Sequence, residues 1–308
     1  MQGSNKRFWS KRLEKVVERL IGAGGLLSIV LVALIFIFVV KEGLPLFKTT
    51  DPGDFFTGKR WQPSLPPPTG PWFGLLPNLW GSVLVTFGAA VLAVPLGLTT
   101  AVFIAEVAPK RLRSFFKGFI ELLSVIPSVA LGFVGAVVVN PLVKDVFNLD
   151  TGKSAIAGSL MLALIALPTI ATIAEDGLAA VPRAYQDASL AIGATRWQGI
   201  RRVIVPAALP SLIAAVMLGI GRAIGETMVV IMVTGNAGLL PDNGIWYAFT
   251  HSVRTITGTI GAEALEVANG EPHYHAIFML ATVLFAITFI VNFVADFAMR
   301  RQRRRVAV

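Results

Sequence analysis

The chain contains no cysteine and few charged residues for its length. Of its 308 residues 15% are charged, whereas soluble domains usually carry about 25%. The missing cysteines exclude disulfide frameworks, cysteine-ligated metals, iron–sulfur clusters and thiol nucleophiles. The missing charge, together with 55% hydrophobic residues and a mean hydropathy of +0.71, indicates that much of the surface faces lipid.

Six apolar runs are long enough to cross a bilayer, whose hydrocarbon core of about 30 Å takes roughly 20 helical residues. The first run follows basic residues, as a signal peptide would, but it ends in Val-Val-Lys-Glu without a small-residue cleavage site, so we expect a retained anchor. The sequence therefore predicts an all-α membrane protein with six transmembrane helices. The expected spans are Leu20–Val40, Leu79–Ala105, Phe119–Val139, Ala155–Ile173, Leu209–Val233 and Ile277–Val294.

The basic residues predict the orientation of these spans. Of the 27 lysines and arginines, 19 fall in the two ends and alternate connections, and 7 fall in the other three connections. Cytoplasmic segments carry the excess of positive charge, so both termini are expected in the cytoplasm. This clustering at span ends also argues against nucleic-acid binding, despite the net charge of +9.

These features divide the chain into five segments. A basic cytoplasmic N-terminus (1–19) precedes the first span (20–40), and a basic cytoplasmic tail (300–308) follows a core of five spans (79–299). The external segment 41–78 is rich in proline and aromatic residues, and we expect it to be irregular and to lie at the membrane interface. A second long external connection, 234–276, contains the run Thr255–Thr259; it is too polar to span but could line a vestibule.

Three patterns resemble known sites but do not predict them. Gly152-Lys153-Ser154 resembles the end of a P-loop, but Phe147 stands where the pattern needs its first glycine. The glycines of the fifth span are one residue too widely spaced for a dinucleotide loop, and they favour close helix packing instead. The three histidines lie in external connections without cysteine partners, so we expect no metal site. No catalytic residue set is apparent.

A cytoplasmic connection before the fifth span carries the most informative pattern. It reads Asp187-Ala188-Ser189, three residues, Gly193, nine residues and then Val203-Ile204-Val205-Pro206. This resembles the EAA-x3-G-x9-I-x-L-P loop of binding-protein-dependent ABC importer permeases. Gly193 and Pro206 match outright, while four other positions carry conservative replacements.

The residues of this segment, 183–206, explain how it could bind a partner. Gly193 can adopt backbone angles that other residues resist, so two short helices can fold back on each other there. The flanks combine apolar side chains with a cationic rim: Ala191, Ile192, Trp197 and Ile200 beside Arg196, Arg201 and Arg202. The alternative is an amphipathic helix lying on anionic lipid.

Three further segments resemble PstC, the permease subunit family of the phosphate-specific transporter. They are Gly221–Met228 (GRAIGETM), Glu121–Val129 (ELLSVIPSV) and Phe73–Pro77 (FGLLP), and the resemblance extends from about residue 20 to 300. The sister family PstA shares the arginine–glutamate core, but Thr227-Met228 and Phe73–Pro77 favour PstC.

The resemblance implies a type I ABC importer bundle in the bacterial inner membrane. The expected partners are a PstA-like permease, two PstB-like ATPase subunits and a PstS-like periplasmic phosphate-binding protein. The chain itself has no Walker motif and needs no cofactor, since ATP would be bound by the partner. Asp187, Ala188, Gly193, Arg196, Trp197 and Pro206 would form the ATPase-coupling loop.

Arg222 and Glu226 are the expected centre of the substrate pathway, with Thr227 and Ser128 beside them. Charged side chains at membrane depth normally face a cavity or each other. The spacing i, i+4 places Arg222 and Glu226 on one helix face. We expect Glu226 to hold Arg222 when the pathway is empty and to keep phosphate from binding there too tightly. A purely structural ion pair is the alternative.

Other functions stay open at this point. A permease for sulfate or molybdate, or a PstA-like sister subunit, has the same general features. A membrane enzyme lacks a plausible catalytic set within the spans, and a secondary transporter does not explain the 183–206 loop.

Overall fold

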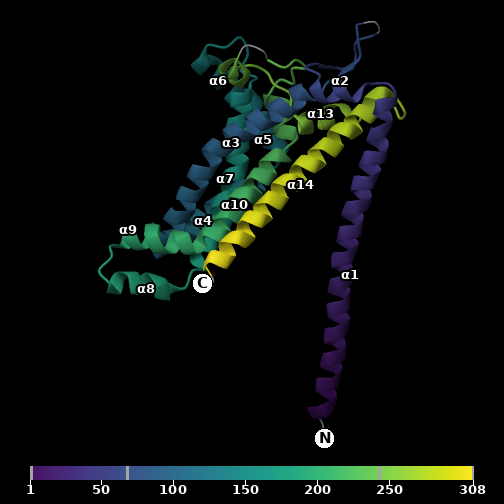
Figure 1. Ribbon diagram of the computed structural model, residues 1–308. Helices are drawn as coiled ribbons and strands as arrows, with labels where there is room; N and C mark the ends of the chain where they lie inside the picture. Colours follow the sequence, from purple (N-terminus) through teal and green to yellow (C-terminus); the bar gives the residue numbers. More distant parts are fainter. Residues whose placement is uncertain (1–2, 67–68, 242–243, 307–308) are drawn as a thin grey trace.

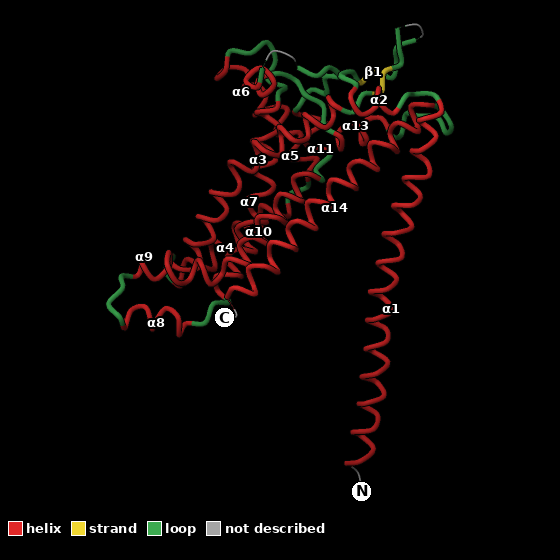
Figure 2. Tube along the Cα trace, in the orientation of Figure 1, coloured by secondary structure: helices red, strands yellow, loops and turns green. Residues whose placement is uncertain are grey.

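The computed structural model describes residues 3–66, 69–241 and 244–306, and most of them are helical (Figures 1 and 2). This part of the chain contains six helical runs that are long and apolar enough to cross a membrane, which confirms the predicted number. The ends of the expected segments 1–19 and 300–308, and two prolines of the external loop, lie outside the described residues.

The first span is the helix α1 (Gly3–Gly43), which stands apart from the other helices. None of its apolar span is buried, against 61% of the span in α7 (Ala155–Ala179). Near its C-terminal end α1 packs on α14 (Pro272–Val306), where the rings of Phe36 and Phe285 lie 4.7 Å apart. The two helices then diverge toward the N-terminus (Figure 1).

The external segment after α1 is ordered, contrary to the expectation of an irregular loop. It forms a 3-10 turn (Leu44–Lys48), the helix α2 (Pro52–Thr57) and an antiparallel pair of short strands, β1 (Trp61–Gln62) and β2 (Trp72–Phe73). We call residues 44–66 and 69–75 the cap. Three of its aromatic residues, Phe55, Trp61 and Phe73, belong to a buried core against α14 and α13 (Ile256–Glu263), whereas Phe56 and Trp72 are exposed. The members of this core are Leu46, Phe55, Trp61, Phe73, Leu75, Ile256, Ala276, Ile277, Met279 and Leu280.

The bundle is built around α7, which packs between α3 (Leu76–Val102) and α10 (Val205–Ile224). Small residues allow this close approach: a Cβ on Gly97 of α3 would lie 2.8 Å from Ile170 of α7, and Gly219 of α10 meets the other side of Ile170. Glycine at such contacts lets membrane helices approach closely. A π-helical turn (Phe103–Val107) follows α3.

The third span lies further along the chain than predicted. The expected helix 119–139 is interrupted, because Pro127 has no N–H and restricts Ile126 to an extended conformation, with ψ 127°. An amphipathic helix α4 (Lys110–Val125) ends there. The span runs over Ser128–Phe147 as α5 (Ser128–Val134), a π-helical turn (Gly135–Val139) and α6 (Asn140–Phe147).

The fifth span also differs from the prediction, which was 209–233. The long helical run covers Arg196–Ile224 and comprises α9 (Arg196–Gly199), a π-helical turn (Ile200–Ile204) and α10. It stops at Gly225, and the shorter helix α11 (Met228–Val233) follows. The remaining helices are α8 (Arg183–Ala191) before the run and α12 (Ile245–Thr250) and α13 after it.

The two ends of the bundle differ in character. The loops and the cap gather at one end, and the α8–α9 hairpin lies at the opposite end, as do both chain termini (Figures 1 and 2). The excess of basic residues predicts that this second end is cytoplasmic, so we expect the hairpin and the two ends of the chain in the cytoplasm and the cap outside.

Candidate functional site

Two helical breaks adjoin the third and fifth spans, and the segments that follow the two breaks pack together. One break separates α4 from α5, and the other separates α10 from α11. A Cβ on Gly132 of α5 would lie 2.7 Å from the sulfur of Met232 in α11, so these helices are in close contact. Interrupted helices leave backbone polar groups unpaired, and transporters use such breaks to line a substrate cavity.

Arg222 lies in the last turn of α10 and reaches both neighbouring elements. It donates one hydrogen bond to Thr169 Oγ1 of α7 at 3.1 Å and another to the carbonyl oxygen of Ser124, near the end of α4, at 3.4 Å. Thr169 is in the middle third of α7, so the guanidinium lies at the depth of the bundle centre. The side chain of Arg222 is exposed in the isolated chain.

Glu226 does not hold Arg222, and the expected ion pair is wrong for the described residues. The helix ends at Ile224, so the i, i+4 geometry on which the expectation depended does not apply. Instead Glu226 Oε1 accepts hydrogen bonds from the backbone N–H groups of Met228, at 3.1 Å, and Val229, at 3.4 Å. Its carboxylate therefore caps the start of α11, where unpaired N–H groups favour negative charge.

The other two expected pathway residues lie at the same breaks. Ser128 is the first residue of α5, and Thr227 immediately precedes α11; both are half-buried. Thr227 Oγ1 donates to the carbonyl oxygen of Gly225 at 3.4 Å. The structure thus brings Arg222, Glu226, Thr227 and Ser128 into the region of the two breaks, with Thr169 as a partner that sequence reasoning missed.

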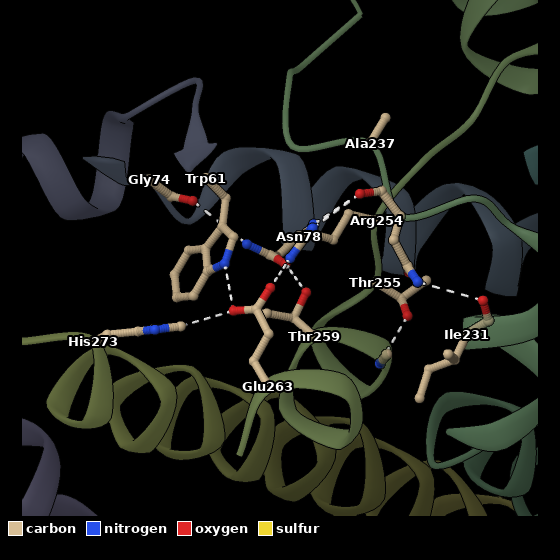
Figure 3. Close-up of polar contacts among 12 residues, drawn as sticks. Trp61, Gly74, Asn78, Ile231, Ala237, Arg254, Thr255, Thr259, Glu263 and His273 are labelled. Carbon is tan, nitrogen blue, oxygen red and sulfur yellow. Dashed lines mark hydrogen bonds and ion pairs between the residues drawn. The ribbon is translucent and has the colours of Figure 1, made fainter. Parts of the chain in front are cut away.

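A polar network near the external surface was also missed. Glu263, at the end of α13, accepts from Trp61 Nε1 of the cap at 3.0 Å and from Arg254, and its Oε2 lies 2.8 Å from His273 Nε2 of α14 (Figure 3). The pKa of Glu263 is lowered, because the hydrogen bonds from His273 and Trp61 and the charge of Arg254 outweigh the larger single effect of burial. The only sequence signal was the run of polar residues in the connection 234–276.

At the cytoplasmic end the chain folds back at Gly193, as predicted. Gly193 has φ +85°, in the left-handed region, and it connects α8 to α9. The start of α9 is fixed by a capping box in which Thr195 and Gln198 exchange side-chain and backbone hydrogen bonds. Ser189 packs on Gly199, where a Cβ would lie 2.8 Å from the serine oxygen, so the hairpin is closed.

The hairpin exposes apolar side chains at its tip. Ile192 is 87% exposed and Trp197 60% exposed. Ile200, which was expected beside them, is buried against the bundle instead, because it lies in the helical run that leads into α10. Asp187, Ala188, Arg196 and Pro206 are exposed, so the other expected coupling-loop residues are accessible to a partner.

Two polar features lie at the hairpin end of the bundle. Lys117 of α4 pairs with Glu175, at 2.6 Å, and Asp176, at 2.7 Å, near the end of α7, and these hydrogen bonds raise its pKa. A cavity of about 480 Å³ separates the hairpin from the end of α3, and its polar lining residues are Glu106, Arg113, Arg183, Gln186, Asp187 and Arg196. Gln186 donates to Glu106 across it at 3.5 Å.

Comparison with known proteins gives relatives of one kind. Residues 93–308 match the family described as binding-protein-dependent transport system inner membrane component. The chain is 36% identical to the probable ABC transporter permease protein YqgH of Bacillus subtilis, over 91% of this chain and 89% of that protein. It is 32% identical to the phosphate transport system permease protein PstC of Mesorhizobium japonicum, over 80% and 78% of the two chains.

Solved structures of the same fold belong to ABC transporters. A chain of a bacterial transporter involved in the import of the acidic polysaccharide alginate superposes with a TM-score of 0.59 at 16% identity, covering 94% of this chain and 99% of that chain. A chain of the methionine transporter MetNI, in an inward-facing conformation, gives 0.58 at 20% identity over 74% and 95%. The chain therefore belongs to the family of binding-protein-dependent transport system inner membrane components, and it is a non-catalytic, multi-pass permease subunit of an ABC importer.

Proposed function

We propose that this permease subunit imports inorganic phosphate and that it is a PstC-like rather than a PstA-like subunit. The observation that carries the proposal is the position of Arg222, a cation held at the meeting point of two interrupted helices. The relatives named PstC, at 28–32% identity, and the three PstC-like segments support phosphate over sulfate or molybdate.

Arg222 has the chemistry that an oxyanion pathway requires. A charged side chain at membrane depth is costly, so its exposure in the isolated chain favours a face turned to a cavity or a second subunit rather than to lipid. Its five N–H donors form a planar fork that matches phosphate geometry. The described hydrogen bonds go to Thr169 and Ser124, which leaves donors for a substrate.

Glu226 keeps the expected role of limiting anion binding, but it acts through its charge and without an ion pair to Arg222. Its carboxylate neutralises the N–H groups at the start of α11, and a passing anion would meet that negative charge close to Arg222. We infer that Glu226 limits how tightly the anion binds, so that release remains fast. Ser128 and Thr227 would add neutral hydroxyl groups to the same region.

The partners follow from the two exposed surfaces. The apolar tip of the α8–α9 hairpin would bind a PstB-like ATPase subunit, which binds the ATP, so this chain needs no cofactor of its own. The unburied helix α1 and the exposed side of Arg222 support association with a PstA-like permease. A PstS-like periplasmic protein would deliver phosphate at the external end.

Reconstitution tests the substrate directly. The chain, co-produced with the second permease, the ATPase and the binding protein of its system, is placed in proteoliposomes, and ATP-dependent uptake of labelled phosphate is measured. We expect saturable phosphate uptake that excess sulfate or molybdate does not reduce. ATP-dependent uptake of sulfate or molybdate in place of phosphate would overturn the proposal.

A further inference from the structure

The short helix α13 connects the external surface to the break that carries Glu226. Near its N-terminal end, Thr257 Oγ1 donates to the backbone carbonyl oxygen of Glu226 at 2.9 Å. Gly261, one turn further on, faces Thr227 so closely that a Cβ there would clash with the threonine methyl group. The break Gly225–Thr227 is therefore covered on its external side by α13.

Hydrogen bonds to α3 hold the sides of α13. Thr259 Oγ1 donates to Asn78 Oδ1 at 2.5 Å, and the backbone N–H of Ile256 donates to Ser82 Oγ at 2.8 Å. Thr257, Thr259 and Asn78 are all buried. A buried polar contact of this kind is stable only while every partner is in place, so these contacts fix α13 in the position described here.

Within the described network, Glu263 is the only side chain of α13 that holds the external end of this helix. Figure 3 shows Trp61 of the cap, Arg254 and His273 converging on this one carboxylate. These three partners come from different segments: the cap, the loop before α13 and the start of α14. A displacement of any one of them would therefore change the hydrogen bonds that hold α13.

We propose that α13 is the external gate over the helix break and that Glu263 is the positioning residue that keeps this gate closed. The proposal rests on the proposed pathway through the break, but not on the identity of the transported anion. Movement of the cap would reach the gate through Trp61, and movement of the gate would reach Glu226 through Thr257.

The charge of Glu263 is the part of this arrangement that can be removed without removing volume. In Glu263→Gln one oxygen becomes an NH2 group, which cannot accept a hydrogen bond from Trp61, Arg254 or His273. Hydrogen bonds to a charged group are among the stronger ones, so their loss should make the open state roughly ten times more populated or more. Glu266→Gln is the matched control, because Glu266 is an exposed carboxylate three residues away.

Accessibility of a cysteine beneath α13 measures the gate directly, because the chain has no cysteine of its own. Val230 of α11 is 1% exposed and lies under Gly258 of α13, so Val230→Cys is the reporter. Ala215→Cys, 0% exposed and in a different core cluster from Val230, reports general loosening. Each is labelled from outside with a membrane-impermeant maleimide in the assembled transporter.

We expect Glu263→Gln to raise the labelling rate at Val230→Cys roughly tenfold, with Ala215→Cys and the Glu266→Gln control unchanged. Trp61→Phe removes one N–H and keeps an aromatic ring, so it should raise the labelling rate at Val230→Cys by a smaller factor. It is the alternative test if the Glu263→Gln transporter fails to assemble. Equal rates in parent and variants, or a rise at both cysteines, would overturn the gate. The labelling needs no phosphate, so it can fail or succeed independently of the proposed substrate.

Discussion

At the scale of single residues, the arginine of α10 is held by groups that leave much of its bonding capacity unused. Thr169 offers one hydroxyl and Ser124 one carbonyl, and neither is charged. A structural arginine buried for stability would be expected to have a carboxylate partner, and the structure describes none for Arg222 within ion-pair distance among residues 3–66, 69–241 and 244–306. Two neutral contacts orient the guanidinium while its charge stays available to a substrate.

Arg222→Gln should abolish most uptake while leaving the transporter assembled. Glutamine keeps a hydrogen-bond donor for Thr169 but loses the positive charge, and we expect at least a roughly tenfold loss, as for a hydrogen bond to a charged group. Uptake and co-purification of the ATPase are measured on the same preparation. Normal uptake would show that Arg222 does not contact the substrate, and loss of assembly would show that its role is structural.

Thr169→Val tests whether the hydroxyl positions Arg222. Valine has nearly the same shape, so only the 3.1 Å hydrogen bond is lost. We expect uptake to fall roughly threefold to tenfold, and we expect Thr169→Ser, which keeps a hydroxyl, to restore most of it. If valine leaves uptake unchanged, or if serine reduces it as much as valine does, the hydroxyl alone does not explain the effect and the positioning role is wrong.

At the scale of the elements, hydropathy predicted the number of spans but not the course of two of them. Apolar composition identifies membrane helices because lipid requires it over about 20 residues, but it does not register a break within an apolar run. Pro127 and Gly225 were the visible signals, and each was read as part of a continuous helix. The lost i, i+4 relation of Arg222 and Glu226 followed directly from that error.

The α8–α9 hairpin was predictable because its turn depends on one residue. A left-handed φ is tolerated by glycine and resisted by residues with a Cβ, so Gly193 within an apolar and basic segment indicated the fold-back. The cap and α13 were not predictable in this way. Their positions depend on contacts across the fold, such as Trp61 with Glu263, that no local pattern records.

Gly193→Val should disrupt coupling through the backbone alone. No atom lies within 4 Å of the position where a Cβ would be built, so the cost comes from φ +85° and not from a clash. A β-branched residue there should cost about 1–3 kcal/mol and open the hairpin. We expect lower ATPase co-purification and lower uptake.

Asparagine provides the control for that substitution, because it accepts the left-handed conformation far better than valine does. Gly193→Asn should retain most ATPase binding and most uptake. Equal losses in both variants would show that the absence of a side chain, rather than the backbone angle, is what the hairpin requires. If ATPase co-purification and uptake are unchanged in both variants, the hairpin does not couple the ATPase to the permease.

At the scale of the whole molecule, the proposed gate and the proposed coupling surface lie at opposite ends of the bundle. The external end holds the cap, α13 and the Glu263 network, and the cytoplasmic end holds the hairpin and both termini (Figure 1). The breaks beside Arg222 lie between them. A permease that alternates between two openings needs this separation, since a gate and a coupling surface at the same end could not act on opposite sides of one site.

The orientation can be tested with single cysteines in this cysteine-free chain. Ser64 of the cap segment and Asn269 before α14 are exposed at the external end, and Gln302 is close to the cytoplasmic C-terminus. The excess of lysine and arginine at the hairpin end predicts which side each one faces. In sealed cells, an impermeant thiol reagent should label Ser64→Cys and Asn269→Cys and leave Gln302→Cys unlabelled until the cells are permeabilised. Labelling of Gln302→Cys in sealed cells would show that the orientation is the reverse of the predicted one. The α8–α9 hairpin would then lie outside, where a cytoplasmic ATPase could not reach it.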